Sequence, residues 1–152
     1  MSTRYRTEAI NDDGGTAVSR VVGGLEVAVM NPLSTDADLT RSNPEQLLAL
    51  AWATCLDATL QAIVKGAHRT RVRVEVELHD SPARGGYEFH VTAFVSAHGR
   101  TLGETEELVG AAHDRCPISR LLQDAATVGI RAEEWADERS TANPRCGMST
   151  PR

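Results

Sequence analysis

The chain has 152 residues, of which 41% are hydrophobic, 24% charged and 4% aromatic, and its formal net charge is −5. This length and composition are typical of one globular domain with an ordinary core, and they argue against disordered, collagen-like and coiled-coil proteins. An acidic chain with few aromatic side chains also lacks the basic surface and the stacking platform that nucleic-acid binding requires.

The sequence carries no pattern that would direct it out of the cytoplasm. Residues 1–13 are charged throughout and contain no apolar segment typical of a secretory signal. The most apolar stretch, 47–64, is interrupted by Asp57 and Gln61, which argues against a membrane span. The three cysteines, an odd number, do not suggest a structural disulfide framework. We therefore expect a cytoplasmic protein.

Short strands are expected in the first part of the chain, where glycine pairs at 14–15 and 23–24 mark turns. The expected strands cover residues 4–11, 17–22 and 25–30. A polar connector over 31–42 follows, and its length is typical of a mobile or functional loop.

A long helix is predicted over residues 44–64. Asn43 is a good N-cap, Pro44 suits the first helical position, and Gln46 has the spacing of a capping box. Leucine, alanine and other apolar residues cover nearly every face of this helix, so it must be buried centrally. One small sheet cannot cover such a helix, which suggests a dimer with intertwined cores.

The remainder of the chain predicts two more helices and three more strands. In the clearest strand, apolar residues alternate with charged ones, and it should form an antiparallel hairpin with the strand that follows. The expected elements are strands over 71–78 and 87–95, a helix over 102–115, a short helix over 117–123 and a strand over 126–132. This order indicates an α+β fold in a single domain, 1–134, followed by a flexible tail, 135–152.

Two cysteines are candidates for chemistry. Cys116 directly precedes Pro117, and if a helix begins there, Cys116 is its N-cap and the more acidic thiol. Cys55 lies in the middle of the long helix and needs a cationic neighbour to become reactive. The alternative for each is that of a small, inert core residue.

Other chemical patterns are weak. Glu45, in the first turn of the long helix, compensates the helix dipole on its simplest interpretation. His113 lies one turn before Cys116, so the two could share a metal or a proton, but no further zinc-ligand spacing accompanies them. The sequence contains no phosphate-binding loop, dinucleotide motif or Gly-x-Ser-x-Gly elbow. We therefore expect no metal and no cofactor.

Two motifs together resemble the OsmC/Ohr family of osmotically inducible and organic hydroperoxide resistance proteins. The first is Asn-Pro-Glu-Gln-Leu at 43–47 with Ala-Trp-Ala-Thr-Cys at 51–55, and the second is Ala-Ala-His-Asp-Arg-Cys-Pro-Ile-Ser at 111–119. The resemblance covers residues 5–133, in the family's order and spacing. The stretch after Cys116 resembles the osmotically inducible branches, whereas residues 43–47 resemble the hydroperoxide resistance branch, so the branch stays open.

The resemblance implies a homodimeric thiol peroxidase with antiparallel sheets around two central helices and active sites at the subunit interface. By this analogy Cys55 attacks the peroxide, Cys116 resolves the sulfenic acid into a Cys55–Cys116 disulfide, and an external dithiol of lipoyl type recycles the pair. Glu45 matches the family's glutamate, which holds an arginine beside the reactive thiolate. The family's arginine motif is missing at 11–16, which leaves Arg20 as the tentative candidate and Arg41 as another.

The expected substrate is an organic, lipid-type hydroperoxide, whose alkyl tail would contact apolar residues such as Leu48 and Trp52. The simpler interpretation of these two residues is that they belong to the core. The alternative function is a catalytically weak family member that binds a small hydrophobic ligand or acts as a redox sensor. Cys146, in the tail, matches nothing in the family and is taken as incidental.

Overall fold

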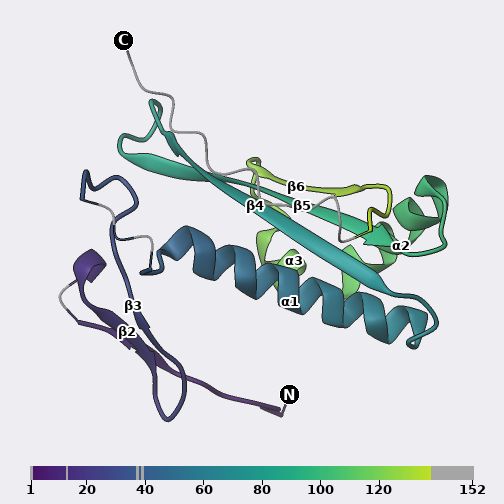
Figure 1. Ribbon diagram of the computed structural model, residues 1–152, viewed down its shortest axis with the longest axis horizontal. Helices are drawn as coiled ribbons and strands as arrows, with labels where there is room; N and C mark the ends of the chain where they lie inside the picture. Colours follow the sequence, from purple (N-terminus) through teal and green to yellow (C-terminus); the bar gives the residue numbers. More distant parts are fainter. Residues whose placement is uncertain (1, 13, 37, 39, 138–152) are drawn as a thin grey trace.

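The computed structural model describes residues 2–12, 14–36, 38 and 40–137. These residues form three α-helices, one short 3₁₀ helix and two three-stranded sheets (Figure 1). The predicted tail over 135–152 lies, from residue 138 on, outside the described residues.

The N-terminal sheet is an antiparallel meander with the strand order β1-β2-β3. Its strands are β1 (Ala9–Asn11), β2 (Val18–Val21) and β3 (Glu26–Ala28), with the 3₁₀ helix η1 (Gly14–Thr16) between the first two. Gly23 has a φ of 75° in the β2–β3 turn, which explains a glycine there. All three strands are shorter than predicted, and β1 begins only at Ala9, opposite Val21, which is the last residue of β2.

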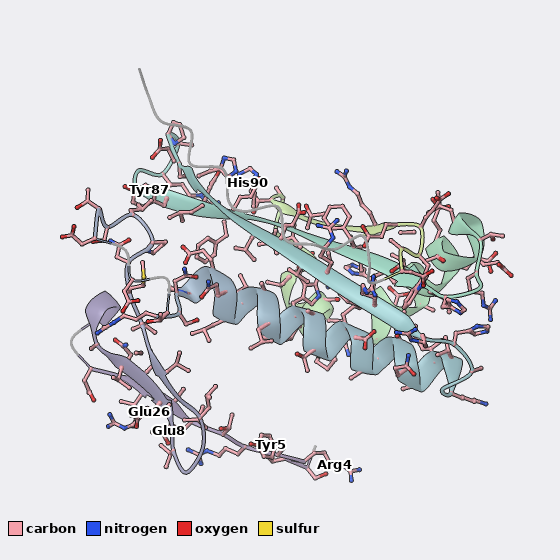
Figure 2. The ribbon with its side chains drawn as sticks, in the orientation of Figure 1. Arg4, Tyr5, Glu8, Glu26, Tyr87 and His90 are labelled. Carbon is pink, nitrogen blue, oxygen red and sulfur yellow. The ribbon has the colours of Figure 1, made fainter. Side chains whose placement is uncertain are left out.

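This sheet stands apart from the rest of its own chain, near the start of the long helix (Figure 1). Side chains of the sheet and of the segment before it project into the surroundings, as Glu26 and Tyr5 show in Figure 2. Tyr5 is 82% exposed, and Val22 and Leu25 are exposed as well. Apolar side chains on an unpacked sheet indicate a surface that another molecule covers.

Helix α1 (Pro44–Val64) has the predicted bounds and cap. The Asn43 side chain accepts a hydrogen bond from the backbone N–H of Gln46 at 2.8 Å. The second half of the expected capping box is absent, since the Gln46 side chain accepts from the Ser42 hydroxyl instead. The helix ends where Lys65 adopts a left-handed conformation with a φ of 51°.

Only one stripe of α1 is fully buried by its own chain. Trp52, Leu56 and Leu60, spaced four residues apart, are completely inaccessible, whereas Leu50 is 61% exposed. By length and composition α1 would suffice to cross a membrane, a test that the core helix of a soluble protein also passes. The uncovered apolar faces agree with the expectation that a second copy packs on this helix.

The second sheet has the order β4-β5-β6 and carries the core. Its strands are β4 (Thr70–Asp80), β5 (Tyr87–Ala97) and β6 (Val128–Ala132). The predicted antiparallel β4–β5 hairpin is confirmed. β6 runs parallel to β5, so this sheet is mixed where an antiparallel one was expected. The reason is that the helices between the two strands return the chain to the same end of the sheet.

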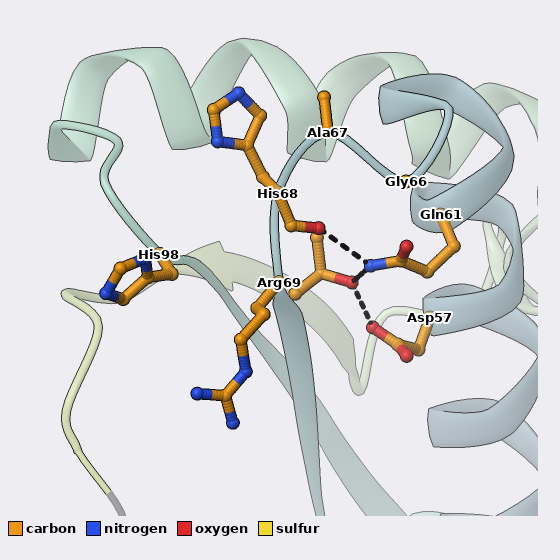
Figure 3. Close-up of a pocket in the computed structure, with 8 residues that line it drawn as sticks. Asp57, Gln61, Gly66, Ala67, His68, Arg69 and His98 are labelled. Atoms are coloured by element: carbon orange, nitrogen blue, oxygen red, sulfur yellow. Dashed lines mark hydrogen bonds between the residues drawn. The ribbon is translucent and has the colours of Figure 1, made fainter.

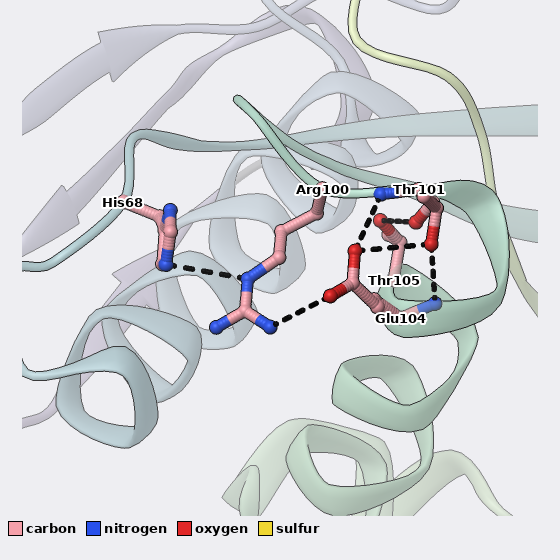
Figure 4. A network of polar contacts seen from close by, with 5 residues as sticks. All are labelled: His68, Arg100, Thr101, Glu104 and Thr105. Carbon is pink, nitrogen blue, oxygen red and sulfur yellow. Dashed lines mark hydrogen bonds and ion pairs between the residues drawn. The ribbon is translucent and has the colours of Figure 1, made fainter.

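Helices α2 (Leu102–Arg115) and α3 (Pro117–Leu122) connect β5 to β6 and share a core with α1 and the sheet. A full capping box fixes the start of α2, in which Thr101 and Glu104 exchange hydrogen bonds. Arg100 joins this network (Figure 4), donating to Nε2 of His68 at 3.2 Å and lying 3.5 Å from the Glu104 carboxylate. The network ties the start of α2 to the loop after α1.

The end of α1 is held to β4 by a second polar network, shown in Figure 3. The Gln61 amide donates to the His68 carbonyl at 3.1 Å and to the Thr70 hydroxyl at 2.6 Å. The Thr70 hydroxyl donates in turn to the Asp57 carboxylate at 2.6 Å. Asp57 and Gln61 therefore interrupt the apolar stretch for a structural reason, at the wall of a pocket of about 440 Å³.

Residues 135–137, assigned to the flexible tail, lie against the second sheet. The guanidinium groups of Arg69 and Arg71 lie 5.2 and 4.7 Å from the centre of the Trp135 ring. Arg71 also donates to the Ala136 carbonyl at 2.7 Å. The packed part of the chain thus extends a few residues past 134.

Candidate active site

The fold brings Cys55 and Cys116 together, although they are 61 positions apart in the sequence. Cys55 lies in the middle of α1, and Cys116 lies at the joint between α2 and α3. Their Sγ atoms are 3.5 Å apart, close enough to share a thiol proton, and both cysteines are free thiols. A disulfide requires about 2.05 Å between the sulfurs, so a small side-chain movement would join them.

The two thiols differ in exposure. Cys116 is completely buried in the core cluster, which also contains Trp52, Leu56 and Ala112. Cys55 is only partly buried, at the edge of the same cluster. A reagent from outside therefore has access to Cys55 but not to Cys116.

The pKa values of the two thiols are shifted in opposite directions. Burial raises the pKa of Cys55, and the neighbouring Cys116 thiol adds to this effect, while the backbone N–H of Ile118 opposes it. Burial also acts to raise the pKa of Cys116, but Ser119, the Cys55 thiol and the backbone N–H of Ile118 together outweigh it, so that this pKa is lowered. Within one chain Cys116 is thus the more acidic thiol, as its predicted position before Pro117 suggested.

Cys116 is the N-cap residue of α3, as predicted, but its side chain makes no capping hydrogen bond. Ser119 follows one turn later, and its Oγ accepts a hydrogen bond from the indole N–H of Trp52 at 2.9 Å. Ser119 and Trp52 are both fully buried. The Cys-Pro-Ile-Ser spacing was the available signal for Ser119, which sequence reasoning placed in a motif without giving it a role.

Glu45 lies in the first turn of α1, and its Oε2 atom is buried without a hydrogen-bond partner in the described residues. A buried, unpaired carboxylate oxygen is costly, so its position indicates a missing donor. Ten residues separate Glu45 from Cys55 on the same helix, which corresponds to about 15 Å along its axis. Glu45 therefore cannot act on the thiol of its own chain.

The two candidate arginines have partners elsewhere. Arg20, in β2, forms an ion pair with Asp12 at 3.1 Å. Arg41 lies just before α1, 3.6 Å from the Asp38 carboxylate and 3.5 Å from the Val29 carbonyl that accepts its hydrogen bond. No cation contributes to the pKa shift of Cys55 in the part of the chain that the structure describes. The described residues of one chain therefore do not supply the stabilising charge expected beside Cys55.

The remaining candidates are placed as follows. Leu48 is partly buried and packs against the core cluster, and Trp52 lies inside it. A role for either in substrate binding stays a prediction. The ring Nδ1 of His113 is buried without a partner, but no three His, Cys, Asp or Glu side chains in the described ranges are placed to hold a metal ion.

Comparison with known proteins assigns the chain to a family. A model of OsmC-like proteins matches residues 36–131, which include both cysteines and all three α-helices. The chain belongs to the OsmC-like family. The resemblance inferred from the two motifs is thereby confirmed, and so is the α+β fold expected from it.

Relatives of this OsmC-like protein carry names from organic hydroperoxide resistance. The organic hydroperoxide resistance protein-like protein of Mycoplasma pneumoniae is 30% identical over 137 residues, which cover 86% of this chain and 95% of the relative. Organic hydroperoxide resistance protein OhrA of Bacillus subtilis is 34% identical over 96 residues, or 61% of this chain and 68% of that protein. The crystal structure of OhrB from Bacillus subtilis matches with a TM-score of 0.76 and 25% identity over 88% of this chain and 100% of that one.

Proposed function

We propose that this protein is a cysteine-based peroxidase that reduces organic hydroperoxides. The observation that carries the proposal is the pair of free thiols, 3.5 Å apart, of which only Cys55 is accessible. The names of the relatives in organic hydroperoxide resistance support the substrate class.

The reaction follows from the unequal positions of the thiols. The Cys55 thiolate attacks one peroxide oxygen, the O–O bond breaks, and the alkoxide leaves as an alcohol after taking a proton. Cys55 becomes a sulfenic acid. The Cys116 thiolate then attacks the Cys55 sulfur and displaces hydroxide, which leaves as water once protonated. The peroxide gains the two electrons that the two sulfurs lose in forming the disulfide.

A second copy of the chain completes the site in this proposal. The Oε2 atom of Glu45 lacks a hydrogen-bond donor, and Cys55 lacks a neighbouring cation, in the described residues. One arginine side chain could supply both. An arginine held by Glu45 would stabilise the thiolate of the other subunit and lower its pKa. Arg20 is the arginine that we assign tentatively, and Arg41 is the alternative. The exposed apolar faces of α1 and of the N-terminal sheet support a homodimer.

The disulfide must be reduced for a second turnover. We assign this step to an external dithiol of lipoyl type, which exchanges with the disulfide through its thiolate and needs no metal or other cofactor. A glutathione- and thioredoxin-reduced cytoplasm is the compartment in which such a pair is kept reduced.

Thiol counting tests the proposal. The Cys146→Ser protein, reduced and freed of reductant, is mixed with equimolar cumene hydroperoxide or hydrogen peroxide, and the free thiols are followed in time. We expect both remaining thiols to be lost, at least about tenfold faster with the organic peroxide, because burial of its apolar group is worth about 1.5–3 kcal/mol. With Cys55→Ser added, the Cys116 thiol should persist.

Slow loss of thiols at equal rates with the two oxidants would contradict a hydroperoxide reductase. That result would favour the weak family member that binds a ligand or senses oxidants, because burial raises the pKa of Cys55 and no cation in the described residues opposes it. Rapid oxidation of Cys116 in the Cys55→Ser variant would contradict the assigned roles.

A further inference from the structure

A buried hydrogen bond connects α1 to α3 close to the two thiols. The indole N–H of Trp52 donates to the Ser119 Oγ at 2.9 Å, and both residues are fully inaccessible. Among the described residues, no other side-chain hydrogen bond joins these two helices. A hydrogen bond is directional, and in the absence of water neither partner has an alternative, so this contact fixes one point of α3 against α1.

The hydrogen bond has a simple relation to the thiol pair. Trp52 precedes Cys55 by three residues on α1, and Ser119 follows Cys116 by three residues. Residues three apart are neighbours on one side of a helix, separated by about 4.5 Å along its axis. The 2.9 Å hydrogen bond and the 3.5 Å contact between the sulfurs therefore lie about one turn apart, between the same two segments.

The position of the Cys116 sulfur is not fixed by its own helix. Cys116 adopts an extended conformation at the joint between α2 and α3, and its side chain makes no capping hydrogen bond. Helix α3 has only six residues and begins with Pro117, which has no N–H to donate. The distance from Cys116 to Cys55 therefore depends on how α3 is held against α1.

We propose that the Trp52–Ser119 hydrogen bond is a positioning contact that keeps Cys116 within reach of Cys55 for disulfide formation. The proposal rests on the proposed function, because it concerns the second step of that reaction. The two sulfurs must approach from 3.5 Å to about 2.05 Å, and a fixed point one turn away confines α3 to that short movement. Trp52 and Ser119 act through the helices that carry them and touch no reacting atom in this proposal.

The step itself balances without a further reagent. The Cys116 thiol releases its proton to solvent, and the thiolate gives an electron pair to the Cys55 sulfur. The S–O bond of the sulfenic acid breaks, and hydroxide leaves and takes up a proton to form water. Speed matters here, because a second peroxide oxidises a sulfenic acid to the sulfinic acid when the resolving thiol arrives late.

The size of the effect follows from what else holds α3. Misplacing two reacting groups by about 1 Å can cost about 100-fold in rate. Ile118 and Leu122 also pack against the core cluster, so α3 stays on α1 when the hydrogen bond is lost. We therefore expect a partial loss of alignment and an effect of about tenfold on the disulfide step.

The first measurement separates the two steps of one turnover in the Cys146→Ser background. After one equivalent of cumene hydroperoxide, the consumption of peroxide and the formation of the disulfide are followed separately. Ser119→Ala should consume peroxide at the parent rate but form the disulfide about tenfold more slowly, so that dimedone traps more sulfenic acid. Ser96→Ala is the matched control, because Ser96 is also a fully buried serine but lies in β5.

A double-mutant cycle shows whether Trp52 and Ser119 act through their common bond. Trp52→Phe removes the donor, keeps an aromatic ring and should slow the disulfide step to a similar extent. The double variant should be no slower than the slower single variant, because the second change finds the bond already lost. Trp135→Phe is the control for Trp52→Phe, and urea midpoints report the stability of every variant.

The second measurement requires no peroxide. The reduction potential of the Cys55–Cys116 disulfide is determined in dithiothreitol redox buffers. Two thiols that are held together favour the disulfide, so Ser119→Ala should make it easier to reduce. A tenfold smaller equilibrium constant for disulfide formation corresponds to a potential about 30 mV less negative. A general loss of stability, without a change in the alignment of the thiols, would leave this potential unchanged.

A disulfide step and a potential in Ser119→Ala equal to those of Ser96→Ala would overturn the proposal. Effects of Trp52→Phe and Ser119→Ala that multiply in the double variant would overturn it as well. If Ser119→Ala fails to fold, Trp52→Phe decides the matter by the same two measurements. A shifted potential in a protein that does not consume cumene hydroperoxide would contradict the peroxidase function and leave the positioning of the two thiols standing.

Discussion

At the scale of single residues, the site separates an accessible thiol from a shielded one. This separation predicts the behaviour of Cys116→Ser in the Cys146→Ser background, without reductant and with excess peroxide. Cys55 should reduce one peroxide and stay a sulfenic acid, because no resolving thiol remains. Further peroxide should then oxidise it to the sulfinic acid, a product that ordinary thiols do not reverse. Mass spectrometry of Cys55, which gains two oxygen atoms, measures this outcome.

The Cys146→Ser protein alone is the control, and it should stop at the disulfide without gaining oxygen. If Cys55 resisted over-oxidation equally well in both proteins, Cys116 would not be the residue that protects it.

The residue scale is also where sequence reasoning was least complete. The motifs led to Cys55, Cys116 and Glu45 as proposed site residues, but they could not reveal the Trp52–Ser119 contact, which joins residues 67 positions apart.

At the scale of elements, the capping box of α2 fixes the helix that ends at Cys116, and it depends on ionised Glu104. The Glu104 carboxylate accepts from the backbone N–H of Thr101 at 2.8 Å. This bond, the Thr101 hydroxyl and the nearby Arg100 lower the pKa of Glu104 below its usual 4.5. A lowered pKa in the folded state stabilises the fold above pH 4.5, and this stabilisation is lost as the pH falls through the folded-state value.

Glu104→Gln should therefore be less stable than the wild type at neutral pH, and the two should converge as the solution is acidified. Urea midpoints at neutral pH and at about pH 3 measure this convergence. Glu106→Gln, an exposed glutamate of the same helix, is the control. A Glu104→Gln deficit that persisted at low pH would show that the side chain acts without its charge.

The elements also show how far local sequence signals reach. The bounds of α1 and α2, the N-cap at Asn43 and the β4–β5 hairpin followed from periodicity and capping residues, which act over a few positions. The direction of β6 did not, because it depends on how two helices route the chain between strands. The short strands near the N-terminus were overestimated for a related reason, since a strand exists only as far as its neighbour extends.

At the scale of the whole molecule, the proposed active site needs residues from two copies of the chain. Glu45 and Cys55 are on one helix but about 15 Å apart, so in a twofold dimer each glutamate would serve the other subunit's thiol. Coexpression of Glu45→Gln and Cys55→Ser chains with different affinity tags tests this arrangement. In a mixed dimer, the Cys55 of the first chain meets the intact Glu45 of the second, and the other site carries both changes.

The purified mixed dimer should then regain about half of the wild-type peroxidase rate, because one of its two sites is intact. Both parent proteins, Glu45→Gln and Cys55→Ser, should be slow or inactive, which makes the recovery visible above their background. A mixed dimer no faster than the average of its parents would place Glu45 and Cys55 in the same functional unit of one chain. The spacing of the two residues along α1 argues against that result, since no rotamer of a glutamate spans three helical turns.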